Sequence, residues 1–132
     1  MARILIVDDE GDVVTLIRFV LEKDGHSVVP APHPGVAFEL LGIDPPAEGK
    51  ALPDLIIMDM LMPVMDGLTA CGKLAASRPE IRGIPVIVLS AKGALRETFE
   101  QHPNVKGFVD KPFDPKRLRD TIDSIIPRPP RG

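Results

Sequence analysis

The sequence alternates between short runs of apolar residues and longer stretches in which apolar residues recur at helical spacing. The apolar runs 4–7, 55–58 and 86–89 are typical of strands that are buried on both faces of a sheet. Weaker apolar patterns at 27–29 and 107–109 predict two further strands, and we expect the first of them near a sheet edge. The pattern therefore predicts five strands.

Helices are expected between these strands, because apolar residues there recur three and four positions apart. The predicted helices cover 12–23, 34–41, the residues after Asp66, 93–101 and 115–126. A long connection, 42–53, separates the second helix from the third strand. Strands that alternate with helices predict an α/β fold, in which helices cover both faces of a parallel sheet.

Chemically active side chains follow four of the five predicted strands. They are Asp8 and Asp9 after the first strand, Asp59 after the third, Ser90 after the fourth and Lys111 after the fifth. In open α/β sheets, ligands bind beyond the carboxyl ends of the strands, where the strand order reverses. We therefore expect these side chains to line one crevice.

The residue types in this crevice favour phosphoryl transfer. Carboxylates that crowd together repel each other unless a cation neutralises them, and Mg²⁺ prefers oxygen ligands of this kind. The metal and Lys111 could offset the charge of a phosphoryl group, while Ser90 could donate a hydrogen bond to it. Asp59 stands alone at the end of a predicted central strand, which makes it the best candidate for a nucleophile that forms an aspartyl-phosphate.

Four motifs, each at a strand end, carry a resemblance to a known family. They are Asp8-Asp9, Asp59-Met60-Leu61-Met62-Pro63-Val64-Met65-Asp66-Gly67, Ser90-Ala91 and Lys111-Pro112-Phe113. In this order they resemble the receiver domain of bacterial response regulators, the chemotaxis-type domain of two-component signalling, over residues 2–126. The resemblance implies a flavodoxin-like (βα)5 fold: a doubly wound, five-stranded parallel sheet in the order 2-1-3-4-5 with five helices.

The resemblance assigns Asp59 the role of phosphoacceptor. The phosphoryl group would come from a histidine kinase or a histidine phosphotransfer protein, in a reaction that depends on Mg²⁺. Asp9, Asp59 and the backbone carbonyl of Leu61 would bind the metal directly, and Asp8 would assist through a bound water. The chain would then be a signalling switch that catalyses only its own phosphorylation and dephosphorylation.

The same resemblance assigns roles to residues around the phosphoryl group. Ser90 and Lys111 would contact its oxygens, and the bond between Lys111 and Pro112 would be cis, which suits a tight turn. Phe108 occupies the aromatic switch position, although the family often has tyrosine there. Phosphorylation would change the surface of the fourth helix, fifth strand and fifth helix, and so signal to a downstream protein from a monomer or a phosphorylation-dependent dimer.

Phe19 lies on the polar side of the first predicted helix, next to Thr15 and Lys23. Two interpretations stay open: a partly covered residue at the edge of the core, or a contact with a partner. In the family, the phosphodonor docks on this helix, so Phe19 is a candidate docking residue for the kinase.

The composition limits the expected cellular location and the classes of partner. The net charge of −3 and the pI near 5.6 argue against the broad basic face that direct nucleic-acid binding needs. No apolar run approaches the ~20 residues of a membrane span. The single cysteine, Cys71, cannot form an internal disulfide, so a cytoplasmic location is expected. Residues 1–126 would form the receiver domain, and 127–132 a tail or the start of a linker.

Other functions remain possible from the residues alone. A receiver-like scaffold that is never phosphorylated would usually lack the acceptor, an acid or the lysine, and all of these are present. A Mg²⁺-dependent phosphohydrolase with an aspartate nucleophile usually spaces its two acids two residues apart and carries a cap. A flavodoxin-like cofactor binder needs a phosphate loop rich in Ser, Thr and Gly, whereas residues 8–12 are mostly acidic.

Overall fold

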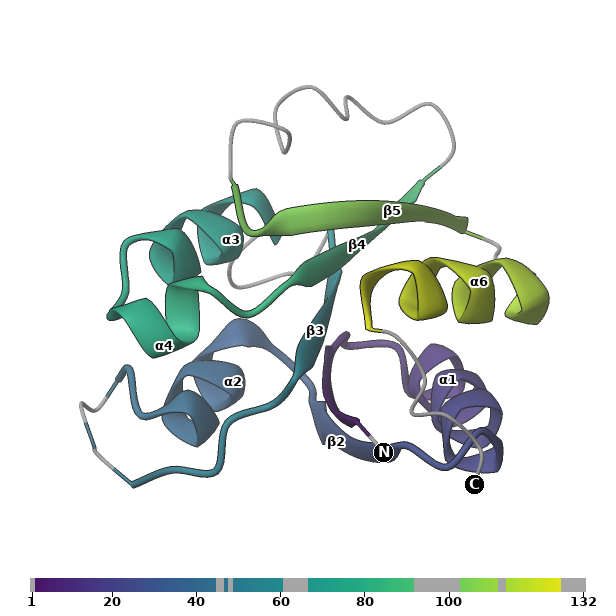
Figure 1. Cartoon of the computed structure of the whole chain (residues 1–132), viewed down its shortest axis with the longest axis horizontal. Coiled ribbons are helices and arrows are strands. Elements are labelled where there is room, and N and C mark those ends of the chain that lie inside the picture. Colours follow the sequence, from purple (N-terminus) through teal and green to yellow (C-terminus); the bar gives the residue numbers. More distant parts are fainter. Residues whose placement is uncertain are drawn as a thin grey trace.

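The fold is built around one parallel sheet. In this computed structural model the described residues are 2–44, 47, 49–60, 67–91, 103–111 and 114–126, with the backbone alone for Gly67, Leu68, Ala91 and Lys111. The strands are β1 (Arg3–Val7), β2 (Ser27–Ala31), β3 (Leu55–Asp59), β4 (Val86–Ala91) and β5 (Val105–Lys111). They pair in parallel in the order β2-β1-β3-β4-β5 (Figure 1), which confirms the predicted order and the edge position of β2.

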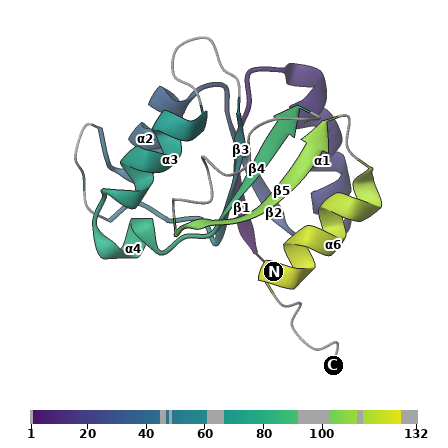
Figure 2. The same cartoon turned by 90° about the horizontal axis from the view of Figure 1, so that it is seen from above.

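Helices cover both faces of this sheet. They are α1 (Gly11–Lys23), α2 (Pro34–Leu41), α3 (Gly67–Ala75), α4 (Pro79–Arg82) and α6 (Pro115–Ile125). Figure 2 shows α1 and α6 on one face and α2, α3 and α4 on the other. The short helix α4 was not predicted, and the helix predicted over 93–101 lies outside the described residues. None of the described helices combines the length and the apolar character needed to cross a membrane.

The core consists of two apolar layers, one on each face of the sheet. Alternate residues of each strand point to opposite faces, so Leu5 and Val7 of β1 pack in one layer while Ile4 and Ile6 pack in the other. All five residues of β3 are buried, as expected for the central strand. The two layers confirm the prediction that the strands with continuous apolar runs are buried on both faces of the sheet.

Cys71 lies inside the layer on the α2 and α3 side and is fully buried. Burial in apolar surroundings disfavours the charged thiolate, which raises the pKa of the Cys71 thiol to about 12. The thiol is therefore neutral and unreactive at physiological pH, in agreement with its interpretation as a small core residue.

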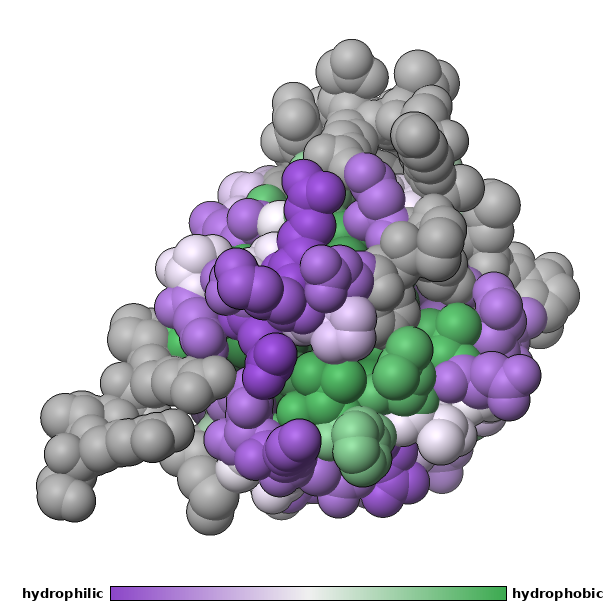
Figure 3. Space-filling model, turned by 90° about the vertical axis from the view of Figure 1, so that its right-hand side faces the viewer, coloured by the Kyte–Doolittle hydropathy of each residue, from purple (hydrophilic) through white to green (hydrophobic). Residues whose placement is uncertain are grey.

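The side of the molecule that carries α1 and α6 has apolar side chains at its surface. Figure 3 shows them gathered in one patch on the side of the molecule that carries α1 and α6. On α1, Leu16 and Phe19 are 42% and 67% exposed. Lys23 Nζ lies 6.0 Å from the centre of the Phe19 ring, a distance at which a cation can interact with the ring face. Phe19 is therefore a surface residue rather than part of the core.

A single arginine fastens the long connection after α2. Gly42 ends α2 in the left-handed conformation (φ 73°). The Arg78 guanidinium donates hydrogen bonds to three backbone oxygens, those of Leu41 (3.2 Å), Gly42 (3.4 Å) and Ala47 (3.1 Å). It also forms an ion pair with Glu80, with Nε 2.7 Å from Oε1. Two of these oxygens lie at the carboxyl end of a helix, where backbone acceptors need partners and a cation is favourable.

We expect Arg78→Ala to lower the free energy of unfolding by about 1–3 kcal/mol, because the substitution leaves three carbonyl oxygens without their charged donor. Urea denaturation followed by circular dichroism measures the change. Arg82→Ala is the matched control, since Arg82 is an exposed arginine at the end of α4, the helix that begins directly after Arg78. Equal destabilisation by the two substitutions would show that the bonds from Arg78 contribute nothing.

Candidate functional site

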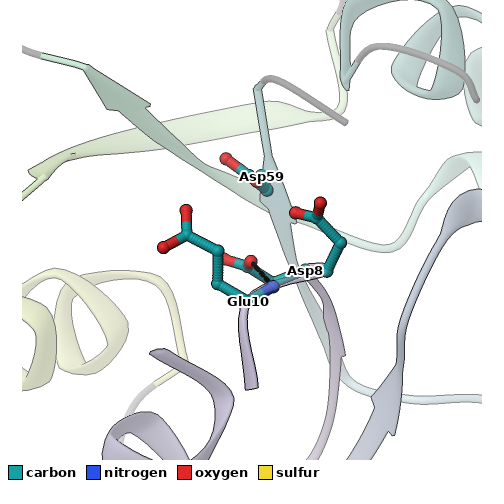
Figure 4. Close-up of side chains that lie close together, drawn as sticks. Asp8, Glu10 and Asp59 are labelled. Carbon is teal, nitrogen blue, oxygen red and sulfur yellow. Dashed lines mark hydrogen bonds between the residues drawn. The ribbon is translucent and has the colours of Figure 1, made fainter. Parts of the chain in front are cut away.

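Four carboxylates meet at the carboxyl end of the sheet. One oxygen from each of Asp8, Asp9, Glu10 and Asp59 lies within 4.8 Å of the others. Asp8 and Asp59 are only 2% and 4% exposed, while Asp9 and Glu10 are exposed. Figure 4 shows Asp8, Glu10 and Asp59 together where β1 and β3 end. The acids predicted from the sequence therefore lie in one cluster, which we call the acidic cluster.

The local backbone explains why these acids gather. The Asp8 nitrogen donates to the oxygen of Ala31 (3.1 Å), which extends the pairing of β1 with β2 by one residue. The Asp8 side chain then accepts a hydrogen bond from the Glu10 nitrogen (2.8 Å), the bond drawn dashed in Figure 4. This turn leads directly into α1, where Glu10 is the residue before the first helical position. Acidic side chains are favourable at this end of a helix.

The donor set suits a hard divalent cation. All four side chains of the acidic cluster offer carboxylate oxygens, the ligands that Mg²⁺ and Ca²⁺ prefer. Two of the four are buried, where like charges repel strongly because water screens them poorly. The residues present therefore fit the magnesium ion that the sequence predicts.

Ser90 lies at the carboxyl end of β4, the strand next to β3. The register of β3 and β4 pairs Asp59 with Leu89, so Ser90 is the next residue along β4. Ser90 is buried, and its hydroxyl donates to Oδ1 of Asp110 on β5 at 3.3 Å. The hydroxyl is thus placed at the carboxyl end of the sheet, as predicted.

The other predicted residues are located in part. Lys111 is the last residue of β5 and pairs with Ala91, but its side chain lies outside the described part of the chain. Leu61 and Pro112 also lie outside it, so the metal-binding carbonyl and the cis peptide bond stay predictions. Phe108 is half-buried and packs against the core layer on the α2 and α3 side.

Sequence analysis missed two residues at this site. Glu10 belongs to the acidic cluster, and its position directly after Asp8-Asp9 was a signal, but the sequence did not show whether it points inward. Asp110 pairs with Ser90 across two strands, and no spacing along the chain predicts that contact.

Comparison with known proteins agrees with this arrangement. Residues 4–123 match the family described as response regulator receiver domain. The chain is 31% identical to Protein PilH of Pseudomonas aeruginosa, covering 96% of this chain and 98% of PilH. It is also 31% identical to the alkaline phosphatase synthesis transcriptional regulatory protein PhoP of Bacillus subtilis, where the match covers 96% of this chain but only 49% of PhoP.

A solved structure also matches this chain over its length. The signal receiver domain of a signal transduction histidine kinase from Syntrophus aciditrophicus superposes with a TM-score of 0.79 at 27% identity, covering 100% of this chain and 97% of that one. The chain spans about half the length of PhoP and nearly all of PilH. With its sheet order, its acidic cluster and its match over residues 4–123, this chain belongs to the response regulator receiver domain family.

Proposed function

We propose that Asp59 accepts a phosphoryl group from a histidine kinase or a histidine phosphotransfer protein. A carboxylate oxygen of Asp59 forms a bond to phosphorus, and the bond from phosphorus to the donor's histidine nitrogen breaks. The observation that carries the proposal is the place of Asp59: a buried carboxylate within an acidic cluster, at the end of the central strand of a receiver domain. Residues 1–126 act as this domain, in the cytoplasm, as a switch rather than as an enzyme with a separate substrate.

Asp8, Asp9 and Asp59 would hold Mg²⁺, together with the backbone carbonyl of Leu61, and the geometry adds Glu10 to the candidates. Bound there, the ion would supply positive charge against the phosphoryl oxygens. Asp9 and Glu10 are exposed, so the acidic cluster reaches solvent on one side. The incoming donor needs this access.

Ser90 and Lys111 complete the site. The Ser90 hydroxyl donates to a phosphoryl oxygen, and the Lys111 ammonium pairs with another. When Ser90 turns toward the phosphoryl group, Phe108 turns inward, and the surface around β5 and α6 changes for a downstream protein. The position of Ser90 one residue beyond the partner of Asp59 supports this assignment.

The direct test is intact mass after incubation with Mg²⁺ and acetyl phosphate. We expect the added mass of one phosphoryl group, and no added mass when EDTA removes the metal. A chain that gains no mass and also binds no beryllofluoride, a mimic of the phosphoryl group, would contradict the proposal and favour a scaffold that is never phosphorylated.

The exposed apolar residues of α1 support a docking role for Phe19. Replacing Phe19 by Asp is expected to slow transfer from the cognate kinase about tenfold or more, because a charge replaces the most exposed large apolar side chain among the described residues. Transfer from acetyl phosphate is expected to stay unchanged, since this donor needs no docking surface. Timed phosphorylation assays with each donor measure both rates.

Leu40→Asp provides the matched control for Phe19→Asp. Leu40 is another exposed apolar side chain, 38% exposed, but it belongs to α2 on the other face of the sheet. We expect it to leave both rates near those of the parent. Equal slowing with both donors in the Phe19 variant would indicate damage to the fold and would count against docking.

A further inference from the structure

We propose that Asp110 is a positioning residue that holds the Ser90 hydroxyl in the unphosphorylated state and thereby opposes the switch. The inference rests on the proposed function, because it concerns the hydroxyl that the phosphoryl group on Asp59 would recruit. Neither Asp110 nor its bond to Ser90 follows from the motifs by which the chain resembles its family. The observations that carry it are the hydrogen bond, the strand register and the burial around Ser90.

The first step concerns the proton of Ser90. A serine hydroxyl has one proton and donates to one acceptor at a time. Here it donates to Oδ1 of Asp110 at 3.3 Å. Ser90 is only 1% exposed, so water is nearly excluded as an alternative partner. The bond to Asp110 and a bond to a phosphoryl oxygen therefore exclude each other, and the first must break before the second forms.

The second step concerns direction. Ser90 and Asp110 are directly paired residues of β4 and β5, so their side chains share one face of the sheet. Val88 and Phe108, two residues earlier on the same strands, pack in the core layer on the α2 and α3 side. Leu89, which pairs with Asp59, packs in the other layer. Asp110 therefore draws the hydroxyl toward the layer that holds Phe108.

The third step concerns the length of this bond and the charge of the Asp110 carboxylate. A distance of 3.3 Å is long for a hydrogen bond between two oxygens, which is typically 2.7–2.8 Å, so the restraint is modest and reversible. The Asp110 carboxylate also carries the same sign of charge as a phosphoryl group. Its removal could therefore favour phosphorylation by releasing the hydroxyl or by lowering repulsion, and the test must separate these two causes.

A double-mutant cycle makes that separation, with beryllofluoride and Mg²⁺ as the probe of the phosphorylated state and ¹⁹F NMR titration as the readout. We expect Asp110→Ala to bind beryllofluoride about three- to tenfold more tightly than the parent chain. In a Ser90→Ala background, where no hydroxyl remains to be released, the same substitution should change the dissociation constant less than about twofold. Asp110→Asn retains an acceptor without the charge and should lie between parent and Asp110→Ala.

Two results would overturn the inference. Beryllofluoride binding to Asp110→Ala that is no tighter than to the parent would show that the bond restrains nothing. A gain of the same size in the Ser90→Ala background would assign the effect to charge alone, and Asp110→Asn would then equal Asp110→Ala. Should Asp110→Ala fail to fold, Asp110→Val, which also removes the acceptor and suits a strand, replaces it in both backgrounds.

The proposed function fails separately from this inference. A parent chain that neither binds beryllofluoride nor gains a phosphoryl group would overturn both. A parent chain that does both, with Asp110 variants that behave as the parent does, would overturn the role of Asp110 alone and leave Asp59 as the phosphoacceptor.

Discussion

Asp59→Asn is expected to abolish the uptake of a phosphoryl group from acetyl phosphate, while the parent chain gains about one group per molecule. An amide oxygen is a far poorer nucleophile than a carboxylate oxygen, and the substitution also removes one negative charge from the acidic cluster. The side chains are nearly equal in size, so the buried site keeps its packing. Intact mass measured after the same incubation gives the result directly.

A matched substitution shows whether this effect belongs to the site. Asp44 is an exposed acid in the connection after α2, apart from the acidic cluster, so Asp44→Asn makes the same chemical change without touching the site. We expect it to gain one phosphoryl group as the parent does. A full mass increase in Asp59→Asn would place the acceptor on another residue and contradict the assignment.

Asp9→Asn is expected to raise the Mg²⁺ concentration for half-maximal phosphorylation by about 10- to 100-fold. The substitution replaces a charged ligand by a neutral one, and divalent cations lose affinity as the number of charged ligands falls. Phosphorylation at saturating Mg²⁺ should recover, because Asp59 is unchanged. A Mg²⁺ titration at fixed acetyl phosphate, read by intact mass, separates lost affinity from lost reactivity.

Asp12→Asn tests the same charge change outside the acidic cluster. Asp12 is exposed in the first turn of α1, close to the site, but it does not belong to the group of four acids. We expect a shift below about twofold, since solvent and salt screen a charge at the surface. Glu10→Gln should shift the titration by an intermediate amount. A shift in Asp12→Asn as large as that in Asp9→Asn would indicate a general charge effect rather than a ligand.

The central part of the fold could be predicted because burial leaves a pattern along the chain. The strands at 4–7, 55–58 and 86–89 are buried on both faces, and continuous apolar runs report that directly. β5 extends over Val105–Lys111 rather than 107–109, because an edge strand has polar residues such as Lys106 and Asp110 that hide its length. The short helix α4 has one buried residue, Ile81, which is too few to produce a period.

The site could be predicted only as far as topology determines it. Parallel strands bring their carboxyl ends to one edge, so the meeting of Asp8, Asp9 and Asp59 follows from the order of elements. The contact between Ser90 and Asp110 depends on the register of two strands, and an irregularity between Val86 and Ile87 shifts that register. Register depends on packing across the whole sheet, which no local pattern records.

At the amino ends of the strands, the chain does not have to hold the acidic cluster in place. The connection 42–53 enters β3 from its amino end, while the acidic cluster lies where β1 and β3 finish. Arg78 holds the first part of that connection by donating hydrogen bonds to backbone oxygens, which every residue type has. Gly42 needs its left-handed conformation, and Ile43 and Leu52 pack against the core, but residues 49–51 are exposed. An insertion at 49–51 would leave the chemistry undisturbed, which gives an engineer a place to attach a reporter.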